Sequence, residues 1–170
     1  MISIRDETPG DIPAIHSVNA LAFERPEEAR LVDKLRAACP GALSLVAEQD
    51  GQIAGHILFT PVAIDGCPLQ GGMGLAPLAV LPERQRQGIG SRLVQAGLAR
   101  LRQAGCPYAI VLGHPAYYPR FGFQRASHYG LRSQWEGVPD EAFMALELQA
   151  GALQGVSGVA RYRSEFDEAM

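Results

Sequence analysis

Residues 81–105 have the sequence LPERQRQGIGSRLVQAGLARLRQAG, and the interpretation of the whole chain starts from this stretch. It follows an apolar run, LAPLAV at 75–80, that is typical of a buried strand. Apolar residues then recur at helical spacing until Gly105, where a glycine next to a proline-containing segment ends the helix. The stretch therefore predicts a strand, a glycine-containing turn and a helix in direct succession.

The turn between this strand and this helix has the features of an anion site. The first N–H groups of a helix have no acceptor within the helix and carry a partial positive charge. Gly88 and Gly90 remove the Cβ atoms that would keep an anion away from the backbone. We therefore expect the backbone N–H groups of residues 86–91 to hold a pyrophosphate. The arginines expected to add positive charge nearby are Arg84, Arg86 and Arg92.

Neighbouring residues exclude two common phosphate motifs. Leu93 stands where the dinucleotide fingerprint GxGxxG needs its third glycine. The P-loop is excluded because no lysine follows the glycines.

Charge is distributed unevenly along the 170 residues. The formal net charge is −3, but residues 84–135 contain eight arginines and no acid, which gives this segment +8. The remaining seven basic and eighteen acidic residues give the rest of the chain −11. Such a split favours a local anion site, whereas the acidic total argues against a nucleic-acid partner.

Outward from this segment, the chain alternates between strand and helix patterns. Asp50-Gly51 predicts a two-residue hairpin between strands, because both turn positions need a positive φ. The element order is expected to be β-α-α-β-β-β-α-β-α-β-β. This order predicts an α/β (α+β) fold with a mixed, mostly antiparallel central sheet, flanking helices and one crossover helix. We expect a single domain over 1–150 and a C-terminal extension over 151–170 that holds an edge strand at 159–162.

Two stretches resemble a known family. LAVLPERQRQGIGSRLV at 78–94 resembles the acyl-CoA signature of the GNAT superfamily of N-acetyltransferases, Q/R-x-x-G-x-G/A after a strand, with Gln85, Gly88 and Gly90 in the signature positions. GHPAYYPRFGF at 113–123 is similar to the later Tyr-x-x-x-Gly-Phe element. The resemblance is to the YhbS-like bacterial branch and covers about residues 2–150. It implies this fold and direct transfer of an acetyl group from acetyl-CoA, as co-substrate, to a primary amine.

The resemblance also implies roles for individual residues. The backbone of Leu78, Ala79 and Val80 would hydrogen-bond pantetheine as a further strand would. Tyr118 would be the general acid that protonates the departing thiolate. The residues implied for the phosphate part of the cofactor are Gln85, Arg86, Gln87, Gly88, Ile89, Gly90 and Ser91.

The general base is less defined, because the strand before the turn carries no acid. His114 has a suitable chemistry and follows the strand expected at 108–112, while Glu24 and Glu28 lie at the junction of the first two helices. We take His114 as the second catalytic residue and keep the two glutamates as alternatives. An aromatic plug without catalysis is the alternative for Tyr118 and its neighbours.

Two other functions compete with the enzyme. The chain could bind acyl-CoA without turnover, as a sensor or partner module, or it could be another kind of phosphate-recognising enzyme. Three cysteines without CxxC spacing argue against a disulfide framework or zinc site, so we expect no metal and a cytoplasmic protein. The N-terminus lacks a secretory pattern and no segment is apolar enough to cross a membrane. The acceptor would be a small-molecule or protein amine, and the protein a monomer or homodimer.

Overall fold

The computed structural model describes residues 1–169. The helices are α1 (Ile12–Phe23), α2 (Glu27–Ala38) and α3 (Ile89–Gln103). The strands are β1 (Ile2–Asp6), β2 (Leu43–Gln49), β3 (Gln52–Pro61), β4 (Ala63–Ile64), β5 (Met73–Val80), β6 (Tyr108–Leu112), β7 (Gln124–Arg125), β8 (Leu131–Ser133), β9 (Phe143–Glu147) and β10 (Gly158–Arg161).

The strands form a seven-stranded sheet in the order β1-β2-β3-β5-β6-β9-β7 and a three-stranded sheet in the order β4-β10-β8. In the larger sheet β1 pairs antiparallel with β2, β2 with β3, and β9 with both β6 and β7. The pair β5–β6 is parallel, and α3 is the crossover between these two strands. The expected mixed, mostly antiparallel sheet with flanking helices is therefore confirmed.

The chain divides into two compact units. The first comprises residues 1–60, 76–97 and the chain from Ser164 onward, and the second comprises 61–75 and 98–163. The division of the sequence into a 1–150 domain and a 151–170 extension stays a prediction.

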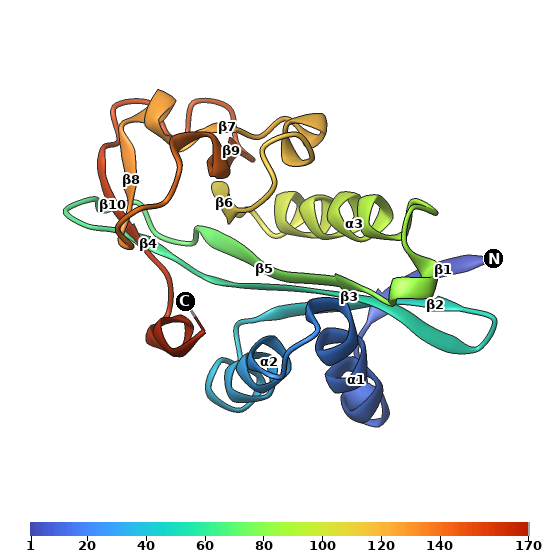
Figure 1. Cartoon of the computed structure of the whole chain (residues 1–170). Coiled ribbons are helices and arrows are strands. Elements are labelled where there is room, and N and C mark those ends of the chain that lie inside the picture. Colours follow the sequence, from blue (N-terminus) through green and yellow to red (C-terminus); the bar gives the residue numbers. More distant parts are fainter. Residues whose placement is uncertain (170) are drawn as a thin grey trace. The chain divides into compact units, whose positions relative to one another are not determined.

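In the first unit, α1 and α2 cover one face of the strands and the beginning of α3 covers the other (Figure 1). The alternation along β3 explains these layers, since successive side chains of a strand point to opposite faces. His56 and Leu58 point toward the α1–α2 layer, and Phe59 points toward α3, where it contacts Gly97. A Cβ atom on Gly97 would lie 2.3 Å from a ring carbon of Phe59, so the helix comes close only because residue 97 is glycine.

Local sequence signals account for the ends of these elements. Asp50 and Gly51 have φ values of 54° and 76°, and Gln49 pairs with Gln52, which is the expected two-residue hairpin. A 3₁₀ turn at Pro9–Asp11 precedes α1. There the Asp11 carboxylate accepts hydrogen bonds from the N–H of Thr8 (2.7 Å) and from its hydroxyl (3.0 Å).

In the second unit, β6 and β9 pair along their full lengths, and β10 lies between β4 and β8. The strand expected at 159–162 is therefore a middle strand and not an edge, because it pairs antiparallel with β4 and parallel with β8. The helix expected after the strand at 108–112 is replaced by two 3₁₀ turns, η3 (Tyr118–Phe121) and η4 (Ala126–Tyr129). Each ends at a glycine with a positive φ, Gly122 at 100° and Gly130 at 74°, and these left-handed residues stop the turns from growing into α-helices.

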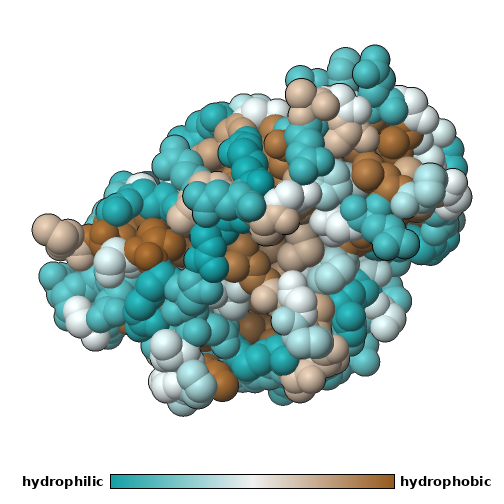
Figure 2. Space-filling view, turned by 180° about the vertical axis from the view of Figure 1, so that it is seen from behind, coloured by the Kyte–Doolittle hydropathy of each residue, from teal (hydrophilic) through white to brown (hydrophobic). Residues whose placement is uncertain are grey.

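Figure 2 shows one face of the molecule, on which hydrophobic residues form separate patches among hydrophilic ones. Among residues 1–169, no helix combines the length and the apolar character needed to cross a membrane.

Candidate functional site

The strand, turn and helix of residues 73–97 lie in direct succession, as the sequence predicts. β5 ends at Val80, a short 3₁₀ turn η2 (Pro82–Arg84) follows, and α3 begins at Ile89. Residues 85–88 are exposed, whereas Ile89 is buried. Arg86 and Gly88 both have positive φ values, 64° and 83°. This backbone turns sharply and presents an exposed segment directly before the amino end of a helix, which is the geometry that suits an anion.

The start of α3 is held close to the sheet by Gly55 of β3. A Cβ atom at residue 55 would lie 3.0 Å from side-chain atoms of Ile89 and Leu93, and 3.2 Å from the carbonyl oxygen of Ala79. The helix and the end of β5 therefore both approach the backbone of β3. This packing fixes the amino end of α3 relative to residues 78–80.

Two side chains of the turn are engaged in holding it. The Gln85 side-chain amide donates to the carbonyl of Val80 (3.1 Å), which ties the turn to the strand end. The Arg84 guanidinium hydrogen-bonds Gln49 and Gln52 (3.3 Å to the latter) and lies 3.8 Å from the carboxylate of Asp50. Arg84 therefore stabilises the turn against the β2–β3 hairpin, and its contribution of positive charge to the anion site stays a prediction.

The second unit carries Tyr118 and His114. Tyr118 is 7% exposed, its ring meets those of Tyr117 and Phe123 edge-on at 5.1 and 5.8 Å, and it packs over Gly113. Burial, and to a smaller extent the neighbouring Tyr117, raises the pKa of Tyr118 above its ordinary value. The phenol therefore stays protonated over the physiological pH range and can act as a donor, not as a base.

The candidates for the general base differ in how they are engaged. His114 is exposed, and its carbonyl oxygen accepts a hydrogen bond from the N–H of Tyr117 (3.1 Å). Glu24 is exposed and ends α1 with a left-handed φ of 56°. Glu28 accepts two hydrogen bonds from Arg25 (2.5 and 3.1 Å), and its side chain is 12% exposed. Glu28 is thus already paired, whereas the side chains of His114 and Glu24 reach solvent.

The structure places the site residues in two groups. Residues 78–80 and 85–91 belong to the first unit, and His114 and Tyr118 belong to the second.

Sequence reasoning missed a buried polar chain in the first unit. His56, which is fully buried, lies 2.9 Å from the hydroxyl of Ser44 through Nε2 and 3.1 Å from the amide nitrogen of Asn19 through Nδ1. The Ser44 hydroxyl in turn bonds Glu7, whose carboxylate also accepts two hydrogen bonds from Arg36 (2.7 and 3.2 Å). No local pattern marks this chain, because its members come from five different parts of the sequence.

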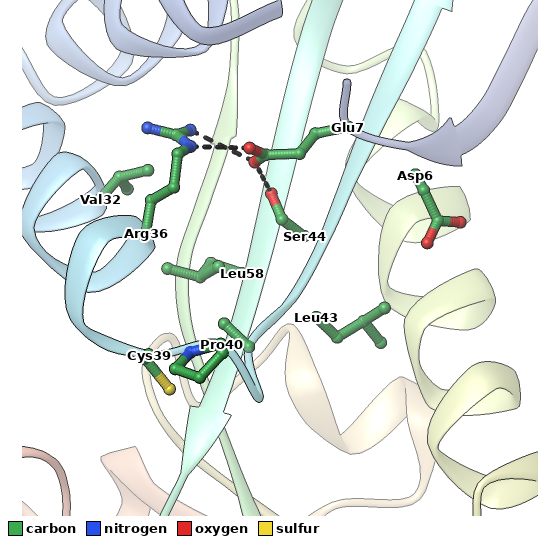
Figure 3. Close-up of a pocket in the computed structure, with 10 residues that line it drawn as sticks. Asp6, Glu7, Val32, Arg36, Cys39, Pro40, Leu43, Ser44 and Leu58 are labelled. Atoms are coloured by element: carbon green, nitrogen blue, oxygen red, sulfur yellow. Dashed lines mark hydrogen bonds and ion pairs between the residues drawn. The ribbon is translucent and has the colours of Figure 1, made fainter. Parts of the chain in front are cut away.

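The outer end of this chain reaches a cavity of about 280 Å³. Figure 3 shows Glu7, Arg36 and Ser44 meeting on its polar side, with Val32, Leu58 and Leu43 among its apolar neighbours. Hydrogen bonds from Arg36 and Ser44 outweigh the effect of burial and lower the pKa of Glu7. The polar chain therefore runs from a partly buried carboxylate at the cavity to the interior beneath α1.

Within residues 1–169, no group of three or more His, Cys, Asp or Glu side chains is arranged to hold a metal ion.

Comparisons with known proteins agree on one family. The sequence profile described as "Acetyltransferase (GNAT) family" matches residues 12–123. The uncharacterized N-acetyltransferase YhbS of Escherichia coli K12 is 41% identical over 165 residues, which cover 96% of this chain and 98% of that protein.

Two solved structures are similar along nearly the whole chain. Crystalline E. coli YhbS in complex with CoA matches with a TM-score of 0.91 at 40% identity, covering 98% of this chain and 92% of that one. A GNAT family acetyltransferase from Brucella melitensis in complex with acetyl-CoA matches with a TM-score of 0.81 at 39% identity, covering 98% and 99%.

Proposed function

Because the chain belongs to the acetyltransferase (GNAT) family, we propose that this N-acetyltransferase binds acetyl-CoA on residues 78–91 and transfers the acetyl group directly to a primary amine. The observation that carries the proposal is the junction of β5, the exposed positive-φ turn and the start of α3. The CoA and acetyl-CoA complexes of the two similar structures support the choice of cofactor.

The pantetheine arm would bind the backbone of Leu78, Ala79 and Val80. The parallel pairing of β5 with β6 covers only Met73–Leu75 of β5. The later part of the strand therefore offers N–H and C=O groups that an amide-rich arm can bind as one more strand. The pyrophosphate would then lie against the N–H groups of residues 86–91, at the amino end of α3.

The acceptor nitrogen starts as an ammonium group and ends as an amide, so it loses two protons, and the thiolate gains one. The amine nitrogen attacks the thioester carbon, the C–N bond forms and the C–S bond breaks. His114 would take the first proton from the acceptor's ammonium group before the attack, and Tyr118 would give its proton to the departing thiolate. The second proton, which the nitrogen loses as the amide forms, would return Tyr118 to its protonated form. The buried, protonated Tyr118 supports its role as the donor, and the exposed His114 supports a role at the mouth of an acceptor site.

The cytoplasm is the compartment we propose for this reaction. The three cysteines, Cys39, Cys67 and Cys106, are free thiols in the structure, which suits a reducing compartment. We propose a small-molecule or protein amine as acceptor, and a monomer or homodimer as the working form.

The proposal is tested by two measurements on the full chain. Titration calorimetry with acetyl-CoA should give saturable binding, and the absence of binding would overturn the proposal. Incubation with acetyl-CoA and a panel of primary amines should release CoA thiol and add one acetyl group to an amine, detected by mass spectrometry. The enzyme without amine is the control, since its own three thiols react with thiol reagents. Binding without any acetylated amine would favour the non-catalytic acyl-CoA module.

A further inference from the structure

Asn19 of α1 and His56 of β3 form a hydrogen bond in the interior that the proposed reaction does not use. Both side chains are fully buried. The Asn19 amide nitrogen donates to the carbonyl of Ile15 (3.0 Å) and lies 3.1 Å from Nδ1 of His56. Since that nitrogen has only hydrogens to offer, Nδ1 of a neutral His56 is the acceptor, and Nε2 carries the ring proton.

The rest of the polar chain agrees with this tautomer. Nε2–H of His56 donates to the Ser44 hydroxyl, and the single hydroxyl proton of Ser44 goes to the Glu7 carboxylate. Every donor points along the chain toward Glu7, which Arg36 holds from the other side. His56 is therefore not a base for Ser44, and these residues do not form a nucleophilic site.

The pair is costly as a means of stability alone. A buried polar group without a hydrogen-bond partner costs free energy, and Oδ1 of Asn19 is buried with no such partner among the described residues. Apolar residues of similar shape at both positions would avoid this penalty. A hydrogen bond is directional, whereas an apolar contact is not. The bond between Asn19 and His56 therefore fixes the rotation of α1 about its axis and its position along β3.

The element fixed in this way packs on the strand that carries the proposed cofactor site. Val18, which precedes Asn19 in α1, forms a buried cluster with Ala79 and Leu81, and Ala22 and Phe23 pack against it. Leu81 in turn donates its N–H to the carbonyl of Ala54 (2.9 Å). The position of α1 therefore bears directly on residues 79–81.

We propose that Asn19 and His56 are positioning residues for acetyl-CoA: their hydrogen bond sets α1 so that its Val18 face holds Ala79 in place for the pantetheine arm. The inference rests on the proposed function, because it assigns the backbone of residues 78–80 to the cofactor. It adds that two interior residues, outside the site, determine how well that backbone is arranged.

The test replaces the bond without leaving an orphaned polar group. In the double variant N19L/H56L we expect the urea midpoint of unfolding to equal or exceed that of the parent protein. The KM for acetyl-CoA and its Kd by calorimetry should both rise about tenfold, with kcat retained. Amide NMR signals of Ala79 and Leu81 should shift in the cofactor-free variant. T60V, which removes a buried hydroxyl elsewhere on β3, is the matched control and should leave the Kd unchanged.

The conservative variant N19Q keeps an amide N–H2 group that can donate to Nδ1 of His56, so its affinity for acetyl-CoA should stay within about twofold of that of the parent. The proposal is overturned if N19L/H56L binds acetyl-CoA like the parent, or if T60V loses as much affinity. It is also overturned if affinity falls only in proportion to stability across the variants. A parent protein that binds no acetyl-CoA overturns the proposed function itself, whereas a parent that binds normally while the double variant also binds normally removes only this inference.

Discussion

The Nε2 atom of His56 lies 2.9 Å from the hydroxyl of Ser44, and the two residues come from neighbouring strands at diagonal positions. In the register of β2 and β3, Ser44 faces Leu58 and Val46 faces His56. Ser44 and His56 thus share one face of the sheet, where diagonal neighbours are within reach of long side chains. This contact keeps a titratable side chain in the interior at the junction of the sheet and the α1–α2 layer.

The stability of the protein should depend on pH through His56. Burial lowers the pKa of His56 from 6.5 to about 4 in the folded state. As the pH falls below about 6.5, the unfolded chain takes up a proton that the folded chain refuses, so the free energy of unfolding falls. Between pH 7 and pH 5 we expect a loss of roughly 2 kcal/mol in urea unfolding experiments.

The variant H56Q isolates this effect, because glutamine does not titrate. Its free energy of unfolding should change much less between pH 7 and pH 5 than that of the parent. The pKa of Glu7 is lowered in the folded state, so its contribution to the free energy of unfolding is lost only below the range of pH 5 to 7 that is measured. If the free energy of unfolding of H56Q changes with pH as much as that of the parent, a group other than His56 causes the pH dependence.

Gly88 and Gly51 offer a matched pair for the proposed pyrophosphate turn. Both have positive φ, 83° and 76°, and a Cβ atom at either would meet no atom within 4 Å. Alanine should therefore strain both turns equally, by about 1 kcal/mol. Only G88A should weaken acetyl-CoA binding in calorimetry, by about tenfold, since its methyl group would occupy the space of the phosphate oxygens. Equal losses in G88A and G51A would mean that general destabilisation, not the site, explains the change.

The arginines of the turn should differ in their effects on the cofactor. Arg86 is exposed, whereas Arg84 is held by the β2–β3 hairpin. We expect R86A to raise the Kd for CoA about fivefold, a loss near 1 kcal/mol that is typical of one charge-assisted contact, and to weaken its dependence on salt. R84A should change the Kd less than about twofold while lowering the urea midpoint. A larger increase of the Kd for CoA in R84A than in R86A would show that Arg84 takes part in the anion site.

Tyr118 should govern turnover and not binding. Y118F keeps the ring that packs over Gly113 and against Phe123, so the fold should be retained. Loss of the phenolic proton should lower kcat about 100-fold with little change in the KM for acetyl-CoA. Because the pKa of Tyr118 is raised, ionisation of this phenol should not reduce kcat between pH 7 and pH 9. Y117F is the control, and equal turnover in the two variants would remove the proposed acid.

Local patterns predicted those parts of the molecule that local forces determine. The hairpin at Asp50-Gly51 and the succession from β5 through the turn to α3 depend on glycine conformations and on periodicity within a few residues. The parallel pair β5–β6 also follows from the sequence, because a crossover helix requires it.

Features that depend on distant pairing were not visible in the sequence. The strand at 158–161 pairs with both β4 and β8, and its position in the middle of a sheet is decided by segments about 30 and 100 residues away, a distance along the chain that no local pattern reports. Arg84 was placed near the anion site because it is close in sequence, but the hydrogen bonds that its side chain makes to the hairpin at residues 49–52 depend on distant packing. The series of hydrogen-bonded side chains that links Glu7 to Asn19 was not predicted for the same reason, since burial of a polar residue depends on how the layers assemble.

Gly55 has a consequence for attempts to move this cofactor turn into another protein. The segment 81–105 looks self-contained, but the depth at which α3 begins is set by the missing side chain at residue 55, in a different strand. A graft of the segment alone onto a sheet with an ordinary residue there would raise the helix, and with it the turn, away from the strand end. The transferable module is thus discontinuous: it consists of residues 78–97 together with one glycine about thirty positions upstream.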